Sequence, residues 1–223
     1  MLATRNPGKI REIAAIYAGL GTRFADLGEW PALGALPEDG ETYADNAASK
    51  AVAVARATGL PALADDSGVE IDALGGAPGV RSRRLLGDVA SDAERNAHVL
   101  ALLAGLPAAR RTARYRAAVA VATPDGTVQT FEGACEGVIV ERPRGAGGFG
   151  YDPIFAPAGE ERTMAEVPLE VKNRLSHRAR ALRAARAAVA RALGMEEEGP
   201  GAGANNFEVS PVHDSSGRRT GPA

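Results

Sequence analysis

The chain contains little cysteine, little histidine and few aromatic residues. Its single cysteine, Cys135, cannot form an internal disulfide, and it excludes a zinc site built from several thiolates. Among the three histidines, His98, His177 and His213, no two have the spacing of metal ligands on one helical face. Because aromatic residues make up 4% of the sequence, alanine, valine and leucine must fill most of the interior.

Long apolar runs and an excess of positive charge are also missing. No run approaches the ~20 apolar residues of a membrane-spanning helix, and Arg5 and Lys9 interrupt the segment where a signal peptide would lie. Lys and Arg number 26 against 28 Asp and Glu, whereas general nucleic-acid-binding domains are usually basic. We therefore expect a cytoplasmic protein with no membrane and no nucleic-acid partner. The charge balance does not exclude a small anionic ligand bound in a local basic pocket.

Helical and strand patterns alternate along the 223 residues, which predicts an α/β fold with a mixed sheet. Apolar residues at helical spacing predict helices over 10–17, 42–58, 91–103 and 176–193. Shorter apolar segments predict strands over 61–74, 113–122 and 128–140, after a very short first strand at 1–4. We expect one domain over 1–194 and a disordered tail over 195–223, where apolar residues almost disappear.

Three segments could carry chemistry, and each also has a purely structural interpretation. The segment TRNPGK, where a strand leads into a helix, could bind phosphate through free N–H groups and a lysine, or form an ordinary turn. The acids of DDSG, which we expect at the end of an apolar strand, suit Mg²⁺ or an Asx-type turn. Because strand side chains alternate, one of Asp65 and Asp66 should face a given cleft. The basic segment KNRLSHR precedes a helix with Ser176 as N-cap. Cations there oppose the helix dipole, so the segment could bind an anion, or it could form a solvated basic face.

A fourth segment, GAGGFG at 145–150, matches a dinucleotide-binding fingerprint in letters alone. Tyr151-Asp152-Pro153 follows it, and a helix cannot begin there as that fingerprint requires. The loop could instead let the backbone approach a base, or it could be a flexible hairpin loop.

Together, five stretches resemble the noncanonical purine nucleoside triphosphate pyrophosphatase family, the Ham1-like and inosine triphosphatase proteins. They are LATRNPGK, PEDGETYADNAASKA, LADDSGVEIDALGGAPGVRS, GAGGFGYDPIF and KNRLSHRARAL. The resemblance implies a long mixed sheet flanked by helices, two lobes with a central cleft (a Ham1/Maf-like fold) and a homodimer. It also implies hydrolysis of ITP, dITP and XTP to the monophosphate and pyrophosphate.

The same resemblance implies roles for individual residues. Glu38 and Asp66 would hold Mg²⁺, and Asp66 would also activate water, with Ser67 beside it. The residues expected to bind the substrate's phosphates are Thr4, Arg5, Asn6, Pro7, Gly8 and Lys9, with Asn6 and Lys9 the principal contacts. Phe149 would stack on the base, and the other expected base and ribose contacts are Gly150, Tyr151, Asp152, Lys172, His177 and Arg178.

Two departures from the family pattern stand near these positions. Ser82-Arg83-Arg84-Leu85 occupies the place of Ser-Ala-Arg-Tyr, and Val171 replaces an acid. The alternatives are a Maf-like pyrophosphatase acting on dTTP or UTP, which the GGFGYDP and SHR segments disfavour, and a non-catalytic nucleotide-binding module. A nucleic-acid-binding protein is the third alternative, which the net charge of −2 disfavours.

Overall fold

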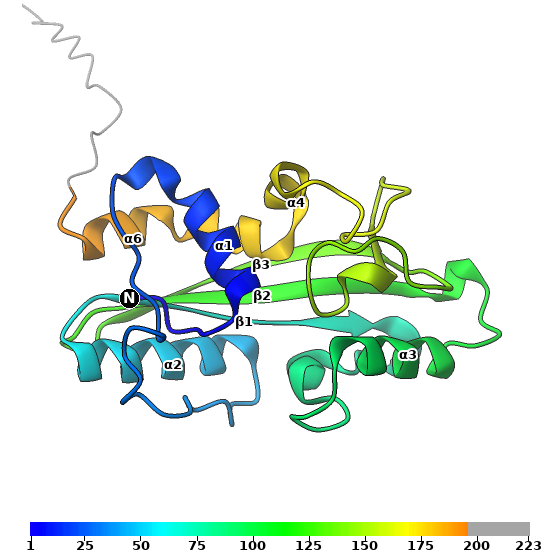
Figure 1. Ribbon diagram of the computed structural model, residues 1–223, viewed down its shortest axis with the longest axis horizontal. Coiled ribbons are helices and arrows are strands. Elements are labelled where there is room, and N and C mark those ends of the chain that lie inside the picture. The colour runs from blue at the N-terminus through cyan, green and yellow to red at the C-terminus, as the bar shows by residue number, and fades with distance from the viewer. Residues whose placement is uncertain (196–223) are drawn as a thin grey trace, which may run out of the picture.

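A computed structural model describes residues 1–195 as a long twisted sheet with helices on both faces (Figure 1). The four strands are β1 (Ala62–Ile71), β2 (Thr112–Ala122), β3 (Val128–Ile139) and β4 (Phe155–Pro157). The α-helices are α1 (Pro7–Ile16), α2 (Tyr43–Thr58), α3 (Asp92–Leu102), α4 (Leu169–Leu175), α5 (His177–Ala184) and α6 (Arg186–Ala192). The predicted α/β class is confirmed. The tail predicted over 195–223 lies outside the described residues apart from Met195.

The sheet has the order β1-β2-β3-β4, and each neighbouring pair is antiparallel. The strands predicted over 113–122 and 128–140 are confirmed as β2 and β3, a hairpin that pairs from Thr112 opposite Val138 to Ala122 opposite Val128. The short first strand is reduced to parallel bridges from Leu2 to Leu63 and to Asp26. These bridges are the parallel part of the sheet within residues 1–195.

Side-chain caps explain where three predicted helices begin. The side chains of Thr42, Ser91 and Ser176 accept hydrogen bonds from the first turns of α2, α3 and α5. The helix predicted over 176–193 is instead two helices separated at Ala185. Tyr17 donates its hydroxyl to the Leu182 carbonyl over 2.6 Å, and an uninterrupted α-helix would use that carbonyl for residue 186.

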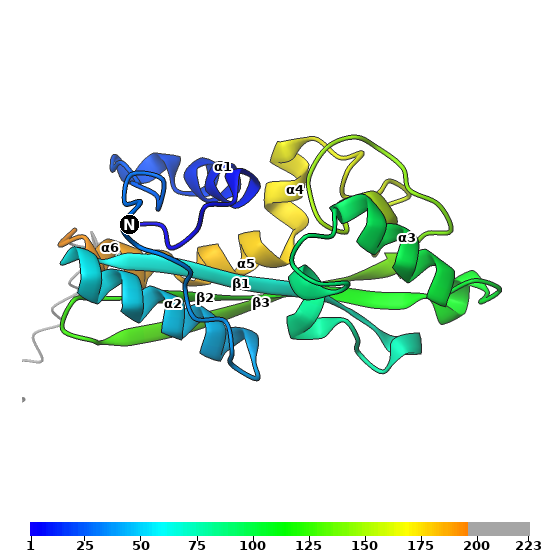
Figure 2. The ribbon, with the colours of Figure 1, turned by 60° about the horizontal axis from the view of Figure 1, so that its bottom comes forward.

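The apolar core divides into clusters that leave the middle of the sheet polar. Helix α2 packs through Ala47, Ala51 and Val54 on one face, while α1, α5, α6 and α3 cover the other. Figure 2 shows α1 and α3 on the same side of the sheet, towards opposite ends. Between them lie Asp65 and Ser67, at the centre of β1 rather than at the predicted strand end. This arrangement gives two lobes that meet over polar side chains.

Within residues 1–195, none of the helices combines the length and apolar character needed to cross a lipid bilayer.

Candidate functional site

A pocket of about 430 Å³ lies where the two lobes meet, next to the middle of β1. It brings together residues that are up to about 170 positions apart in the chain. The predicted site residues that line it are Thr4, Asn6, Lys9, Glu38, Asp66, Ser67, Phe149, Gly150, Tyr151, Asp152, His177 and Arg178. Four predicted residues, Arg5, Pro7, Gly8 and Lys172, do not line it.

The first wall is the beginning of α1. Asn6 is its N-cap, and its side-chain oxygen accepts from the N–H groups of Gly8 and Lys9 at 2.8 and 3.2 Å. The prediction of free N–H groups is therefore wrong for these two residues, because the cap already uses them. Arg5 points elsewhere and donates to the carbonyls of Leu33 and Gly34. Lys9 is the cation that this segment presents to the pocket.

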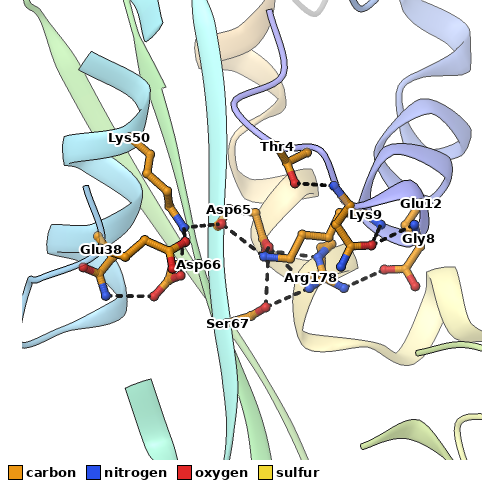
Figure 3. Close-up of polar contacts among 12 residues, drawn as sticks. Thr4, Gly8, Lys9, Glu12, Glu38, Lys50, Asp65, Asp66, Ser67 and Arg178 are labelled. Carbon is orange, nitrogen blue, oxygen red and sulfur yellow. Dashed lines mark hydrogen bonds and ion pairs between the residues drawn. The ribbon is translucent and has the colours of Figure 1, made fainter. Parts of the chain in front are cut away.

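Adjacent acids of β1 face opposite sides of the sheet, as the alternation of strand side chains predicts (Figure 3). Asp66 points toward α2, where its two oxygens accept from Lys50 at 2.8 Å and Asn46 at 3.1 Å. Glu38 contacts the same Lys50 ammonium at 2.9 Å. Glu38 and Asp66 therefore lie close together on one cation, as a shared divalent ion requires.

Lys50 and Glu38 each favour the charged form of the other. Burial lowers the pKa of Lys50, but Asp66 and Glu38 outweigh burial and hold it above its ordinary value. Burial raises the pKa of Glu38, and the Lys50 ammonium outweighs that effect, so the pKa lies below its usual value. Both groups are thus charged at neutral pH. Lys50 is not among the predicted site residues, although its place on the apolar stripe of α2, four residues before Val54, was a signal.

On the other face, Asp65 begins a buried ion chain that connects the lobes. Its carboxylate pairs with Lys9 at 2.5 Å and Arg178 at 3.0 Å. Glu12 of α1 then pairs with Arg178 at 2.7 Å and Lys172 at 2.8 Å, and Lys172 pairs with Asp152 at 2.5 Å. The chain contains three cations and three anions, namely Lys9, Arg178, Lys172, Asp65, Glu12 and Asp152. Its net charge is zero when all are ionised.

Charge pairing decides the ionisation of the two acids at the α1 end. Burial raises the pKa values of Asp65 and Glu12, but their cations outweigh it and both values lie below the ordinary range. Burial keeps the pKa of Asp152 above its ordinary value despite Lys172. Sequence reasoning missed Glu12 and gave Asp65 no partner, because their partners are distant in the chain.

The opposite wall is formed by the loop around Phe149. Its ring packs on Gly8, where a Cβ atom would lie within 2.5 Å of two ring carbons. Lys172 and Arg178 lie 4.6 and 5.3 Å from the ring centroid. Asp152 folds the loop by accepting from the Phe149 N–H at 2.8 Å. The loop thus presents an aromatic ring flanked by cations.

His177 is the other flat group of this wall. Its ring stacks on Tyr115 with centroids 4.4 Å apart and planes 7° apart. Burial, followed by the positive charge of Arg178, lowers the pKa of His177 well below 6.5, so the imidazole is neutral. Within residues 1–195 its Nδ1 atom is buried without a hydrogen-bond partner. A buried polar atom of this kind is expected to pair with a bound molecule or water.

The pocket therefore has two chemically distinct ends. Lys9, Glu38 and Asp66 suit a polyphosphate and a divalent cation, whereas Phe149 and His177 suit a flat heterocycle with polar edges. Within the described residues no group of three or more His, Cys, Asp or Glu side chains could hold a metal alone. Two carboxylates fit Mg²⁺, which commonly completes its coordination with substrate phosphates and water.

Comparisons with known proteins give matches over most of the chain. The family model described as the Ham1 family matches residues 1–188. A dITP/XTP pyrophosphatase of Desulforamulus reducens is 49% identical over 185 residues, 83% of this chain and 92% of the relative. One of Geobacter sulfurreducens is 51% identical over 182 residues, 82% of this chain and 92% of the relative. The structure of a HAM1 protein from Coxiella burnetii superposes with a TM-score of 0.76 at 38% identity, covering 85% of this chain and 97% of that one.

Proposed function

This chain belongs to the Ham1 family, and from that membership we propose that it hydrolyses ITP, dITP and XTP to the monophosphate and pyrophosphate. The observation that carries the proposal is that one pocket contains both the Lys9, Glu38 and Asp66 end and the Phe149 end. A nucleoside triphosphate has the same two ends, an anionic chain and a flat base. The cellular consequence is removal of deaminated purine nucleotides before polymerases use them.

The triphosphate carries about four negative charges, which repel an attacking water until cations offset them. Lys9 would leave Asp65 for a phosphate oxygen, while Arg178 continues to neutralise Asp65. Glu38 and Asp66 would hold Mg²⁺, which supplies positive charge and makes a bound water more acidic. Asp66 orients the water that attacks the α-phosphorus and accepts its proton, as the bond to the pyrophosphate oxygen breaks.

Base selectivity follows from an unpaired polar group near Phe149. Nδ1 of neutral His177, a residue that lines the pocket, is the group available to act as a donor. Lys172 does not line the pocket and pairs with Glu12 and Asp152, so it acts on the base end through the Phe149 ring that it flanks. Hypoxanthine and xanthine carry a 6-carbonyl that accepts from such a donor, whereas the 6-amino group of adenine would leave it unpaired. A site built on hydrogen bonds can discriminate by ~10⁴-fold for that reason.

The test is pyrophosphate release from ITP, XTP, GTP, ATP and dTTP, with Mg²⁺ and with EDTA. We expect release from ITP and XTP that requires Mg²⁺, and a loss of kcat of ~10²-fold or more in Asp66→Asn. Asp72→Asn is the matched control, because Asp72 is an exposed acid that follows the same strand and pairs with Arg114 outside the pocket. Preference for dTTP would support a Maf-like enzyme, and no release from any substrate would support a binding module.

We also propose that the protein is a homodimer and acts in the cytoplasm. Support for the dimer comes from an exposed part of the sheet beyond α2, which carries both basic and acidic side chains. Arg114 and Arg116 of β2 pair there with Glu136 and Glu132 of β3, a pattern that a second copy could match. Light scattering at several concentrations tests it, and a constant monomer mass would contradict it. The cytoplasmic location stays a prediction.

A further inference from the structure

Helix α3 holds the loop that carries Phe149, although none of the family stretches includes residues 92–96. The N–H of Gly150 donates to Asp92 over 2.7 Å, and its carbonyl accepts from Asn96 over 3.1 Å. Asp92 and Asn96 are four positions apart and therefore lie on one face of the helix. Both polar groups of a single loop residue are bound by one helical face.

Gly150 is the position where the loop most depends on such support. Its φ of +62° lies in the left-handed region that favours glycine, and a Cβ there would meet no other atom within 4 Å. The backbone of Gly150 itself is therefore held by these hydrogen bonds, next to the buried side chain of Tyr151, which donates to the Ser82 carbonyl over 2.8 Å. Phe149, whose ring lies over Gly8, directly precedes Gly150, and Asp152, which contacts Lys172, lies two residues after it.

The same helix also holds the segment on the other side of the pocket. Arg95 is buried, and its guanidinium donates to the carbonyls of Leu85 and Gly87 at 3.1 and 3.3 Å. Leu85 and Gly87 follow Arg84 within three residues. Arg84, Asp92 and Arg95 line the pocket, whereas Asn96 does not. Asp92 connects the two sets of contacts, because one oxygen pairs with Arg95 at 3.1 Å and the other accepts from Gly150.

We propose that Asp92 and Asn96 are positioning residues for base recognition: they fix Gly150, and through it the Phe149 ring and the Asp152 carboxylate, without taking part in hydrolysis. The inference rests on the proposed function, since it concerns the base end of that site. It predicts that loss of either side chain weakens recognition of the nucleoside and leaves the pyrophosphate end unchanged.

The test uses the two reaction products, inosine monophosphate and pyrophosphate, with binding of each measured by calorimetry in the presence of Mg²⁺. Asn96→Ala and Asp92→Ala should each weaken binding of the monophosphate about tenfold, the scale of one lost hydrogen bond to a charged or buried group. Binding of pyrophosphate should stay within about twofold. In turnover the same variants should raise KM for ITP far more than they lower kcat.

Two further variants separate positioning from general damage to the helix. Asp92→Asn keeps an oxygen acceptor for the Gly150 N–H and should recover most of the monophosphate affinity. Glu94→Ala removes the capping box with Ser91 but contacts neither Gly150 nor Phe149. It should lower thermal stability and leave both affinities unchanged.

The inference is overturned if the Asp92→Ala and Asn96→Ala variants bind the monophosphate as wild type does, or lose both products equally. It is also overturned if Glu94→Ala reproduces their pattern. Failure of the proposed function looks different, because then the wild-type chain itself would bind no inosine monophosphate and release no pyrophosphate from ITP.

Discussion

Replacing Glu12 by glutamine tests the buried ion chain most directly. Glu12 is 4% exposed, and its two oxygens contact Arg178 at 2.7 Å and Lys172 at 2.8 Å. Glutamine preserves the shape and one acceptor, but it removes the negative charge and turns an NH₂ group toward a cation. Three cations would then face the two remaining anions, Asp65 and Asp152.

The size of the effect follows from this imbalance. Removing one partner of a buried ion pair typically costs ~3–5 kcal/mol, because the other charge stays buried without compensation. Arg178 and Lys172 each retain a second carboxylate, so we expect the lower end, about 3 kcal/mol of unfolding free energy. For a domain of this size each kcal/mol lowers Tm by ~2–4 °C, which gives a decrease of about 10 °C.

Urea unfolding and calorimetry of Glu12→Gln, Lys172→Met and the double variant form a double-mutant cycle. Because the residues are in contact, the double variant should be more stable than the sum of the single losses predicts, by at least ~1 kcal/mol. Glu29→Gln is the control, since Glu29 pairs with Arg23 on the surface and should change stability by less than ~0.5 kcal/mol. A loss below ~1 kcal/mol for Glu12→Gln, or strict additivity, would refute the reasoning.

Three shorter predictions concern other contacts. The pKa of His177 lies well below 6.5 in the fold, so the unfolded chain binds an extra proton below pH 6.5 and stability falls as pH drops. Between pH 6.5 and 5.5 the free energy of unfolding should fall by about 1 kcal/mol from this effect. The variant His177→Phe, whose ring can still stack on Tyr115, should lack this decrease when denaturation is measured at the two pH values. Gly133→Ala places a Cβ 2.2 Å from the His177 carbonyl oxygen and should cost ~1–3 kcal/mol, measured by urea unfolding; a neutral result would mean that α5 can move away freely. Glu38→Gln should raise the Mg²⁺ concentration for half-maximal activity about tenfold, on the scale of a lost charged contact, and an unchanged Mg²⁺ titration would remove Glu38 from the metal site.

Local signals in the sequence predict much of the fold. The caps at Thr42, Ser91 and Ser176, and the turn between 122 and 128, depend on residues near one another in the chain, so they can be recognised without tertiary information. The interruption at Ala185 could not be predicted in this way, because its cause is the hydroxyl of Tyr17, 165 positions from the carbonyl it binds.

The candidate site shows the same division. Most of the predicted site residues line one pocket, but their pairing depends on long-range contacts that no spacing reveals. Glu12 and Lys50 were missed because a charged residue in a helix is usually solvated. Arg178 is 2% exposed and bound to Asp65 and Glu12, which contradicts the solvated basic face that remained open as an alternative for its segment.

The alternation at Asp65 and Asp66 makes strand register a determinant of activity. One carboxylate serves the lobe interface and its neighbour serves the acid pair with Glu38, and only the pleat separates them. Deleting one residue between Ala62 and Asp65 would exchange their directions while leaving the composition of the site almost intact. After such a deletion, Asp65 would point toward Lys50 and Asp66 would point toward Arg178. Single-residue length changes before Asp65 should therefore be tolerated far less than substitutions there.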